Sequence, residues 1–179
     1  MKVISGKNNV RIFEMGFGTG LNALLSLIAA DSASCLVDYH TVESAPLPPD
    51  LYRELNYCRV LAREDKQNSF DLLHSSPWNI SVQIDNHFQL LKLNGEFDGH
   101  MPGDGYDLVY WDAFDPVIQP ALWSEDIFTM VRLKMNHGAI LLTYCSKTIV
   151  QLALRRSGFA VEKLPGPHGK REILRAAAV

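Results

Sequence analysis

A glycine-rich turn stands out among the residues that could do chemistry. The sequence FEMGFGTGLN places three glycines at alternate positions between a short apolar run and a helical pattern. Glycine permits positive φ angles and a helix start presents unpaired N–H groups, so this turn can take a nucleoside-type cofactor. The alternative is a tight turn with no ligand. The candidate cofactor-binding residues are Glu14, Gly16, Gly18, Gly20 and Asn22.

The spacing of these glycines discriminates between cofactor classes. A dinucleotide-binding fingerprint is G-x-G-x-x-G, but Leu21 stands where its third glycine would be. The P-loop pattern G-x-x-x-x-G-K-[ST] does not occur in the sequence. The turn therefore favours a nucleoside over a dinucleotide or a nucleoside triphosphate.

Two glutamates follow the next predicted strands. Glu43 ends the run YHTVE, where a carboxylate can accept hydrogen bonds from both hydroxyls of a ribose. Glu96 comes just after the third predicted strand and is a candidate for the edge of an adenine. Alone, Glu43 would be a capping or surface residue, but with the glycine turn it predicts a cofactor clamp.

The segment YWDAFDP begins at the end of a fourth predicted strand and continues beyond it. Ligands of open parallel sheets bind outside the carboxyl ends of the strands, so Asp112 is expected to face the reacting atoms, as the candidate catalytic residue and as a further cofactor contact. Phe114 offers a flat face to a base or to a cationic methyl donor. The alternative is an Asx-type turn with buried aromatic residues, and it has more weight for Asp115 than for Asp112.

Other chemistries find little support. The six histidines and three cysteines form no metal-binding spacing, and no G-x-S-x-G nucleophile motif occurs. An odd cysteine count without a C-x-x-C pair suits a reducing compartment, and the cytoplasm is expected. The most apolar helical stretch, Leu21–Ala30, is half of the roughly 20 residues that cross a bilayer. No membrane span, secretion signal or metal site is predicted.

The charge is unevenly distributed along the chain. The net charge is −3, but from Lys147 to the end seven basic residues face two acidic ones. That last part carries +5 and the rest −8, which suits a polyanionic partner that touches one side. A solvated helix face with a charged turn is the alternative.

Composition and periodicity predict one α/β domain over residues 1–179. The chain is 47% apolar and 21% charged, which is typical of a folded globular domain. Short β-branched and aromatic runs alternate with helical patterns, as in a parallel sheet with helices on both faces. The predicted strands are Val10–Met15, Val37–Val42, Gln89–Leu93, Asp107–Trp111, Ala139–Tyr144, Ala160–Leu164 and Glu172–Ala176.

The helices are expected between these strands. They are predicted at Leu21–Ala30, Leu51–Ala62, Ser69–His74, Glu125–Met135 and Thr148–Ser157. Ser124 and Ser146 are the expected N-caps of the last two, and Gly158 should end the final one. Only a turn, PGPHG, separates the last two strands, so they should form an antiparallel hairpin at the edge of the sheet.

These motifs together resemble class I S-adenosylmethionine-dependent methyltransferases. Within that class the sequence is similar to the MnmC/MnmD-like family, which completes 5-methylaminomethyl-2-thiouridine at the tRNA wobble position. The likeness covers nearly the whole chain, through FEMGFGTGLNALL, YHTVESAPL, YDLVYWDAFDP, GAILLTYCSK and RRSGFAVEKLPGPHGKREILRA. The first motif is shared widely, whereas DAFDP, TYCSK and PGPHGKRE are more specific.

The resemblance implies a Rossmann-like class I methyltransferase fold with a seven-stranded sheet and S-adenosyl-L-methionine as cofactor. The glycines would surround its methionine part, Glu43 would hold its ribose, and Asp112 would lie beside the transferred methyl and the substrate amine. The implied partner is the tRNA anticodon loop, whose bases are read by stacking and phosphate contacts. The candidate substrate-binding residues are Phe114, Lys147, Lys163, Lys170 and Arg171.

The sequence departs from this family in two places. Only nine residues precede Val10, where the family usually has an extended segment and a helix, so an N-terminally truncated chain is expected. The turn before the fifth strand is KMNHG, where Pro-Gly-Gly is common. No sign of the flavin-dependent oxidase domain fused in some members is present.

The leading hypothesis is methyl transfer to the aminomethyl nitrogen of 5-aminomethyl-2-thiouridine in tRNA. An alternative enzyme is a small-molecule amine N-methyltransferase or an aminopropyltransferase. An alternative from another class is a catalytically silent methyltransferase-like binding module. The sequence leaves the oligomeric state open.

Overall fold

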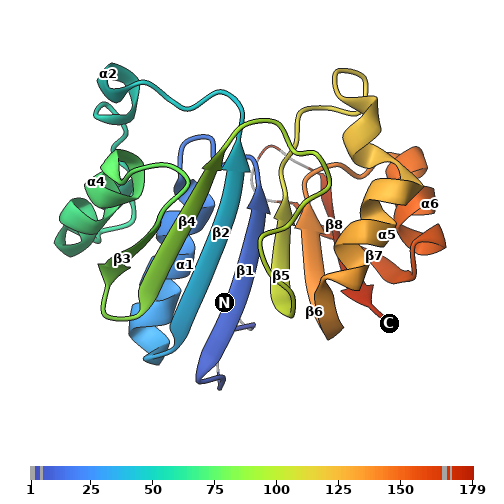
Figure 1. Cartoon of the computed structure of the whole chain (residues 1–179), viewed down its shortest axis with the longest axis horizontal. Helices are drawn as coiled ribbons and strands as arrows, with labels where there is room; N and C mark the ends of the chain where they lie inside the picture. The colour runs from blue at the N-terminus through green and yellow to red at the C-terminus, as the bar shows by residue number, and fades with distance from the viewer. Residues whose placement is uncertain (1–2, 5, 167–168, 170) are drawn as a thin grey trace. The chain divides into compact units, whose positions relative to one another are not determined.

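The computed structural model describes residues 3–4, 6–166, 169 and 171–179 (Figure 1). Its strands follow the order β3-β4-β2-β1-β5-β6-β8-β7. The pairs β2–β4, β1–β5 and β5–β6 are parallel, whereas β3–β4, β6–β8 and β7–β8 are antiparallel. This confirms the mixed α/β fold and the C-terminal hairpin, with eight strands in the described residues instead of seven.

The strands span β1 (Asn9–Met15), β2 (Leu36–Glu43), β3 (Ser81–Asp85), β4 (Phe88–Asn94), β5 (Tyr106–Trp111), β6 (Met135–Thr143), β7 (Phe159–Pro165) and β8 (Glu172–Ala178). The α-helices are α1 (Leu21–Ala33), α2 (Pro49–Tyr52), α3 (Tyr57–Val60), α4 (Gln67–Ser75), α5 (Glu125–Leu133) and α6 (Thr148–Arg156). Two short 3₁₀-helices, η1 (Glu64–Lys66) and η2 (Pro120–Trp123), complete the elements of the described residues. All seven predicted strands are present, most of them one or two residues longer than predicted.

The additional strand is β3, where the sequence pattern predicts no strand. It pairs with β4 across a short turn at Asn86 and His87. Of its five residues only Ile84 is buried. A strand with one buried side chain has little of the apolar signal on which strand prediction depends, and this explains the miss.

The single helix predicted at Leu51–Ala62 is wrong, because the structure has two four-residue helices there. The first, α2, begins at Pro49, and Asn56, before α3, has φ −107° and ψ 26°, outside the helical region. Across α2 and α3 only Cys58 is buried. The segment has no continuous apolar face to bury, so nothing favours one long helix.

The chain divides into two compact units. The first unit comprises Met1–Arg11 and Gly16–Phe97, and the second comprises Ile12–Met15 and Asp98–Val179. Buried apolar side chains occur in both units. The single domain over residues 1–179 stays a prediction.

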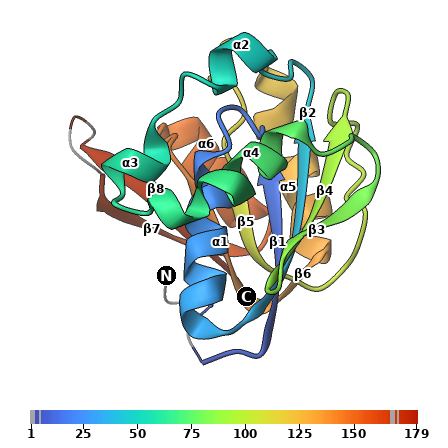
Figure 2. The same cartoon turned by 90° about the vertical axis from the view of Figure 1, so that its left-hand side faces the viewer.

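In the first unit, α1 and α4 lie on the same side of β2 and β4 (Figure 2). The side chains that α1 buries are Ala23, Leu24, Ser26, Leu27 and Ala30, which follow one helical face. The two helices position the turn that connects β1 to α1. Their packing therefore affects the place at which a ligand of that turn would bind.

In the second unit, α5 packs Phe128 against Trp111 of β5, with ring centroids 5.6 Å apart. Ser124 caps α5 as predicted, because its Oγ accepts a hydrogen bond from Ile127 N. The predicted extension of α5 to Met135 is wrong, since that residue begins β6.

Ser146 does not cap α6: the N-cap position is Lys147, which makes no side-chain capping bond. Gly158 follows α6 with φ 84°, as expected after a helix end.

Candidate functional site

The glycine turn of the first unit has the backbone that the sequence predicts. Gly16, Gly18 and Gly20 have φ angles of 89°, 50° and 70°, which residues with a side chain rarely adopt. A Cβ atom added to Gly18 would meet nothing within 4 Å, so its open side faces space that a ligand can enter. A Cβ atom on Gly20 would lie 3.1 Å from His74 Nε2 and from Phe17 Cζ. Gly20 therefore serves close packing, whereas Gly18 leaves room for a ligand.

Glu43 lies at the carboxyl end of β2 and is fixed against this turn. Its Oε2 accepts a hydrogen bond from Gly18 N at 2.9 Å, and its Oε1 accepts one from Ala45 N at 2.8 Å. A carboxylate oxygen can accept more than one hydrogen bond, so both oxygens retain acceptor capacity. The carboxylate is thus oriented before any ligand arrives and can bind a pair of ribose hydroxyls.

Sequence reasoning missed a second group of residues, which contacts the glycine turn at Thr19. His74 of α4 has Nε2 3.2 Å from the carbonyl oxygen of Thr19, and Tyr57 donates its hydroxyl hydrogen to Thr19 Oγ1 at 3.0 Å. The His74 ring also stacks on Tyr52, with centroids 4.6 Å apart and planes 12° apart. These residues come from three helices that carry no recognisable motif, so only the folded structure brings them together.

Lys92 of β4 is a buried cation below the same turn, with 1% of its surface exposed. Its Nζ donates to the carbonyl oxygens of Leu73 and His74, at 2.8 and 2.7 Å, and so caps the end of α4. The ammonium also lies 4.6 Å from the ring centroid of Trp78 and 5.5 Å from that of Phe17. Burial lowers the pKa of Lys92 to about 8, so at neutral pH it remains a cation that links α4 to the turn.

His74 should make the stability of the protein sensitive to acid. Burial lowers its pKa to about 4, below the ordinary value of 6.5. The unfolded chain therefore binds more protons than the folded one between these values, and the free energy of unfolding falls as the pH drops from 6.5 to 4. We expect wild-type protein to lose about 2 kcal/mol more than a His74→Phe variant over this range, measured by denaturant titration at both ends. Equal losses in the two proteins would contradict the assignment.

The other predicted cofactor residues are placed as follows. Glu14 lies in β1 with 1% of its surface exposed, and Asn22 is half-buried at the second position of α1. Glu96 is exposed in the loop after β4. The preceding residue, Gly95, donates its N–H to the carbonyl oxygen of Glu43 at 3.0 Å, which ties the start of this loop to the end of β2.

In the second unit, Asp112 directly follows β5 and its side chain is exposed. Its main-chain N–H donates to the carbonyl oxygen of Met15 at 3.1 Å, which extends the pairing of β1 with β5 by one bond. Phe114 is 58% exposed. Two residues predicted to contact a ligand are therefore presented to solvent by one short loop.

The predicted phosphate-binding residues have different surroundings. Lys147 Nζ lies 2.6 and 2.8 Å from the two carboxylate oxygens of Asp115, and Lys163 pairs with Glu172 at 2.9 Å. Arg171 is exposed. Lys170 lies outside the described residues. Two of the four predicted cations therefore have an acidic partner within the second unit.

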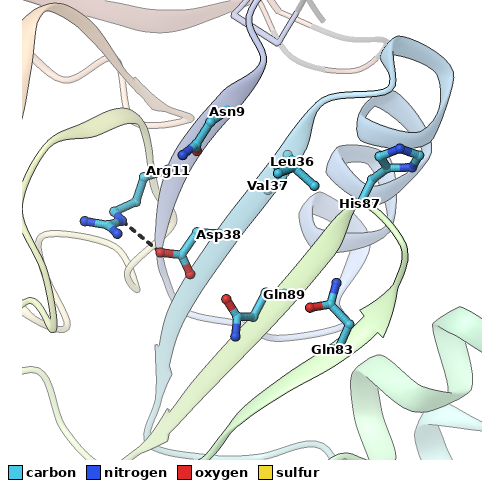
Figure 3. Close-up of a pocket in the computed structure, with 8 residues that line it drawn as sticks. All are labelled: Asn9, Arg11, Leu36, Val37, Asp38, Gln83, His87 and Gln89. Carbon is cyan, nitrogen blue, oxygen red and sulfur yellow. Dashed lines mark hydrogen bonds and ion pairs between the residues drawn. The ribbon is translucent and has the colours of Figure 1, made fainter.

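A separate pocket of about 260 Å³ lies on the first unit (Figure 3). Its lining comes from the starts of β1, β2 and β4, with Gln83 of β3, and most of the lining residues are of polar or charged type. Gly16 and Glu43 follow the carboxyl ends of β1 and β2, so this pocket lies at the opposite ends of those strands. Cofactors of parallel sheets bind at carboxyl ends, and the pocket is therefore not the expected cofactor site.

Comparison with known proteins assigns the family. A family model described as S-adenosyl-L-methionine-dependent methyltransferase matches residues 73–179. The chain belongs to this family. Two curated relatives of the methyltransferase are both named tRNA 5-methylaminomethyl-2-thiouridine biosynthesis bifunctional protein MnmC. The one from Pseudomonas fluorescens is 30% identical over 180 residues, and the one from Campylobacter hominis is 26% identical over 185 residues.

These alignments cover most of the methyltransferase chain but little of its relatives. They include 96% and 98% of this chain, but only 27% and 26% of the two relatives. The chain thus spans about a quarter of the length of the curated relatives it matches.

Solved structures share the fold of the methyltransferase. The crystal structure of MNMC2 from Aquifex aeolicus has a TM-score of 0.72 at 22% identity, and covers 99% of this chain and 55% of that chain. Spermidine synthase from Thermotoga maritima has a TM-score of 0.57 at 16% identity, with 99% and 56% covered. Both likenesses show the fold alone.

The residues of the first unit fit the family's cofactor, S-adenosyl-L-methionine. The open side of Gly18 leaves space beside the turn, and the carboxylate of Glu43 is held at its edge. No group of three or more potential metal ligands occurs among the described residues. Within the same part of the chain, no helix is long and apolar enough to span a bilayer.

Proposed function

We propose that this methyltransferase transfers a methyl group to the aminomethyl nitrogen of 5-aminomethyl-2-thiouridine at the wobble position of tRNA. The names of its curated relatives support this substrate, and so does the DAFDP segment. The observation that carries the proposal is the exposed carboxylate of Asp112 immediately after β5. A carboxylate at this position suits an acceptor that is an amine.

Bound S-adenosyl-L-methionine supplies the electrophilic methyl group, which the amine nitrogen takes as the bond from carbon to sulfur breaks. Asp112 would accept a hydrogen bond from the amine and fix the direction of its lone pair. A carboxylate beside an amine favours the charged ammonium, so we assign Asp112 to orientation and leave the proton to solvent. Glu43 would hold the ribose, with the glycine turn at the methionine part. The roles of Glu14, Asn22 and Glu96 as cofactor contacts belong to the same proposal.

The decisive experiment measures transfer of a labelled methyl group to bulk tRNA that carries the unfinished aminomethyl modification. Mature tRNA and free spermidine serve as the two comparison substrates. We expect label only in the unfinished tRNA. Label in spermidine alone would identify a small-molecule enzyme, and cofactor binding without any transfer would identify a silent binding module. Either result would end the proposal.

Arg171 and Lys163 form the proposed phosphate contact, together with Lys170. We expect Arg171→Gln to weaken tRNA binding and to reduce the slope of log Kd against log salt by about 1, since one phosphate contact is lost. Binding of S-adenosyl-L-methionine should not change. The measurement is a fluorescence titration with tRNA at several salt concentrations, with Lys134→Gln as the matched control for charge removal. An unchanged slope for Arg171→Gln would remove this residue from the contact.

We place this activity in the cytoplasm, where the tRNA is found. The three cysteines, Cys35, Cys58 and Cys145, are buried and unbridged, as is usual in a reducing compartment.

A further inference from the structure

The loop that carries Asp112 and Phe114 is held at three consecutive residues by side chains of the second unit. The Tyr144 hydroxyl donates to the carbonyl oxygen of Ala113 at 2.9 Å. Trp123 Nε1 donates to the carbonyl oxygen of Phe114 at 2.8 Å. Both donors come from outside the loop, one from the residue after β6 and the other from η2. We call residues 112–118 the acceptor loop.

The third attachment is the ion pair between Lys147 and Asp115. Lys147 Nζ donates to both carboxylate oxygens, at 2.6 and 2.8 Å. Asp115 in turn holds the rest of the loop, because its Oδ1 accepts from Val117 N at 2.9 Å and its carbonyl oxygen accepts from Ile118 N at 2.7 Å. The carboxylate thus joins the cation that precedes α6 to the main chain of the acceptor loop.

These bonds stabilise a loop whose large apolar side chains face outward, although the small side chain of Ala113 is buried. Phe114, Val117 and Ile118 are 58%, 82% and 69% exposed, so burial of their side chains contributes little to holding the loop in place. The order of the loop must then come largely from the three polar attachments. Burial raises the pKa of Tyr144 to about 12, so this donor keeps its proton at any physiological pH. The Lys147 ammonium also holds the pKa of Asp115 below its ordinary value, which keeps the carboxylate charged.

We propose that Lys147 is a positioning residue of the acceptor loop, acting through Asp115, and is not a contact to the phosphates of tRNA. The inference rests on the proposed function, because it assigns the loop to the acceptor amine. It reassigns a residue that the charge pattern alone places in the phosphate contact. Lys147 and Asp115 should then change the rate of transfer and leave the electrostatics of tRNA binding unaffected.

The two roles predict different effects of Asp115→Asn. If Lys147 bound phosphate, removing its acidic partner would free the ammonium, and tRNA would bind more tightly with a steeper salt dependence. If Lys147 positions the loop, Asp115→Asn loosens it, and kcat falls while the salt dependence stays the same. Tighter tRNA binding with a steeper salt slope would therefore indicate a phosphate contact, whereas a lower kcat at an unchanged salt slope indicates the positioning role.

The experiment compares Lys147→Gln, Asp115→Asn and the double variant, with kcat, KM for tRNA and the salt slope measured for each. We expect kcat to fall about tenfold in both single variants, since small displacements of a reacting group are costly. The double variant should be no slower than either single one, because all three remove the same attachment. Lys147→Arg should restore kcat, since a guanidinium can also pair with the carboxylate. Lys134→Gln is the matched control, because it breaks the comparable 2.6 Å ion pair with Asp104 in the same unit.

The proposal is overturned if Lys147→Gln raises KM for tRNA and lowers the salt slope by about 1 while kcat is unchanged. Hydrogen exchange of the Val117 and Ile118 amides provides a readout that does not need activity. Faster exchange in Lys147→Gln and Asp115→Asn, but not in Lys134→Gln, supports the attachment, and unchanged exchange refutes it. If wild-type protein transfers no methyl group to tRNA, the proposed function fails, and the exchange data still decide whether Lys147 holds the loop.

Discussion

Replacing Glu43 with glutamine should weaken binding of S-adenosyl-L-methionine about 100-fold. The carboxylate is fixed by Gly18 N and Ala45 N, so an amide would turn its NH₂ group toward one of these donors. It would also lose charge-assisted bonds to two ribose hydroxyls, each worth about 1.5 kcal/mol, and about 3 kcal/mol corresponds to roughly 100-fold in Kd. Isothermal titration calorimetry measures this directly.

Glu54→Gln is a suitable control for the Glu43 experiment. Glu54 is exposed and belongs to the same unit, and the substitution changes the net charge by the same amount. We expect its Kd for the cofactor to match that of wild type. A Glu43→Gln protein that also binds like wild type would show that the ribose is held elsewhere.

Asp112→Asn should reduce kcat for tRNA about 100-fold, since the loss of an oriented hydrogen bond misaligns the amine with the methyl group. The Kd for S-adenosyl-L-methionine should stay within about twofold of wild type, because Asp112 is assigned to the acceptor. Single-turnover transfer of the labelled methyl group gives the rate, and circular dichroism verifies the fold. Asp126→Asn, at an exposed position of α5, is the control.

The pH dependence of this variant separates two roles for Asp112. If the carboxylate only orients the amine, the ratio of wild-type to variant rates should stay constant between pH about 7 and 9. If it accepts the proton, the ratio should shrink as the pH rises, because solvent then removes the proton without help. Full activity of Asp112→Asn at every pH would exclude both roles.

The elements predicted well are those with a strong apolar pattern. The buried strands β1, β2 and β5 and the amphipathic helices α5 and α6 lie close to their expected positions. Where burial is slight the sequence carries little information, as in β3, with one buried residue, or in the broken helical region from Pro49 to Val60. Turn chemistry was informative at the C-terminal hairpin, where PGPHG leaves no room for a helix.

The candidate site was predictable only in its local parts. The glycine turn, Glu43 and Asp112 follow strand ends, and parallel-sheet geometry gives such residues a meaning without a structure. His74 contacts Thr19 of the turn from 55 residues away in sequence, Lys92 lies against the ring of Phe17, and Lys147 reaches its partner 32 residues away. A single sequence contains no signal for such pairs. The positive charge of Lys147 was visible, but its acidic partner was not.

The hairpin strand β7 is the last strand at one edge of the sheet. The residue types along this edge strand affect how readily the protein self-associates at high concentration. An unpaired strand can template fibril-like pairing with another molecule. Here Glu162 and Lys163 are exposed near the middle of β7, and Pro165 ends it. Glu162 also pairs with Arg175 directly opposite it on β8, at 2.7 Å. A second molecule that joined β7 would have to desolvate these charges, so this border resists self-association into fibrils.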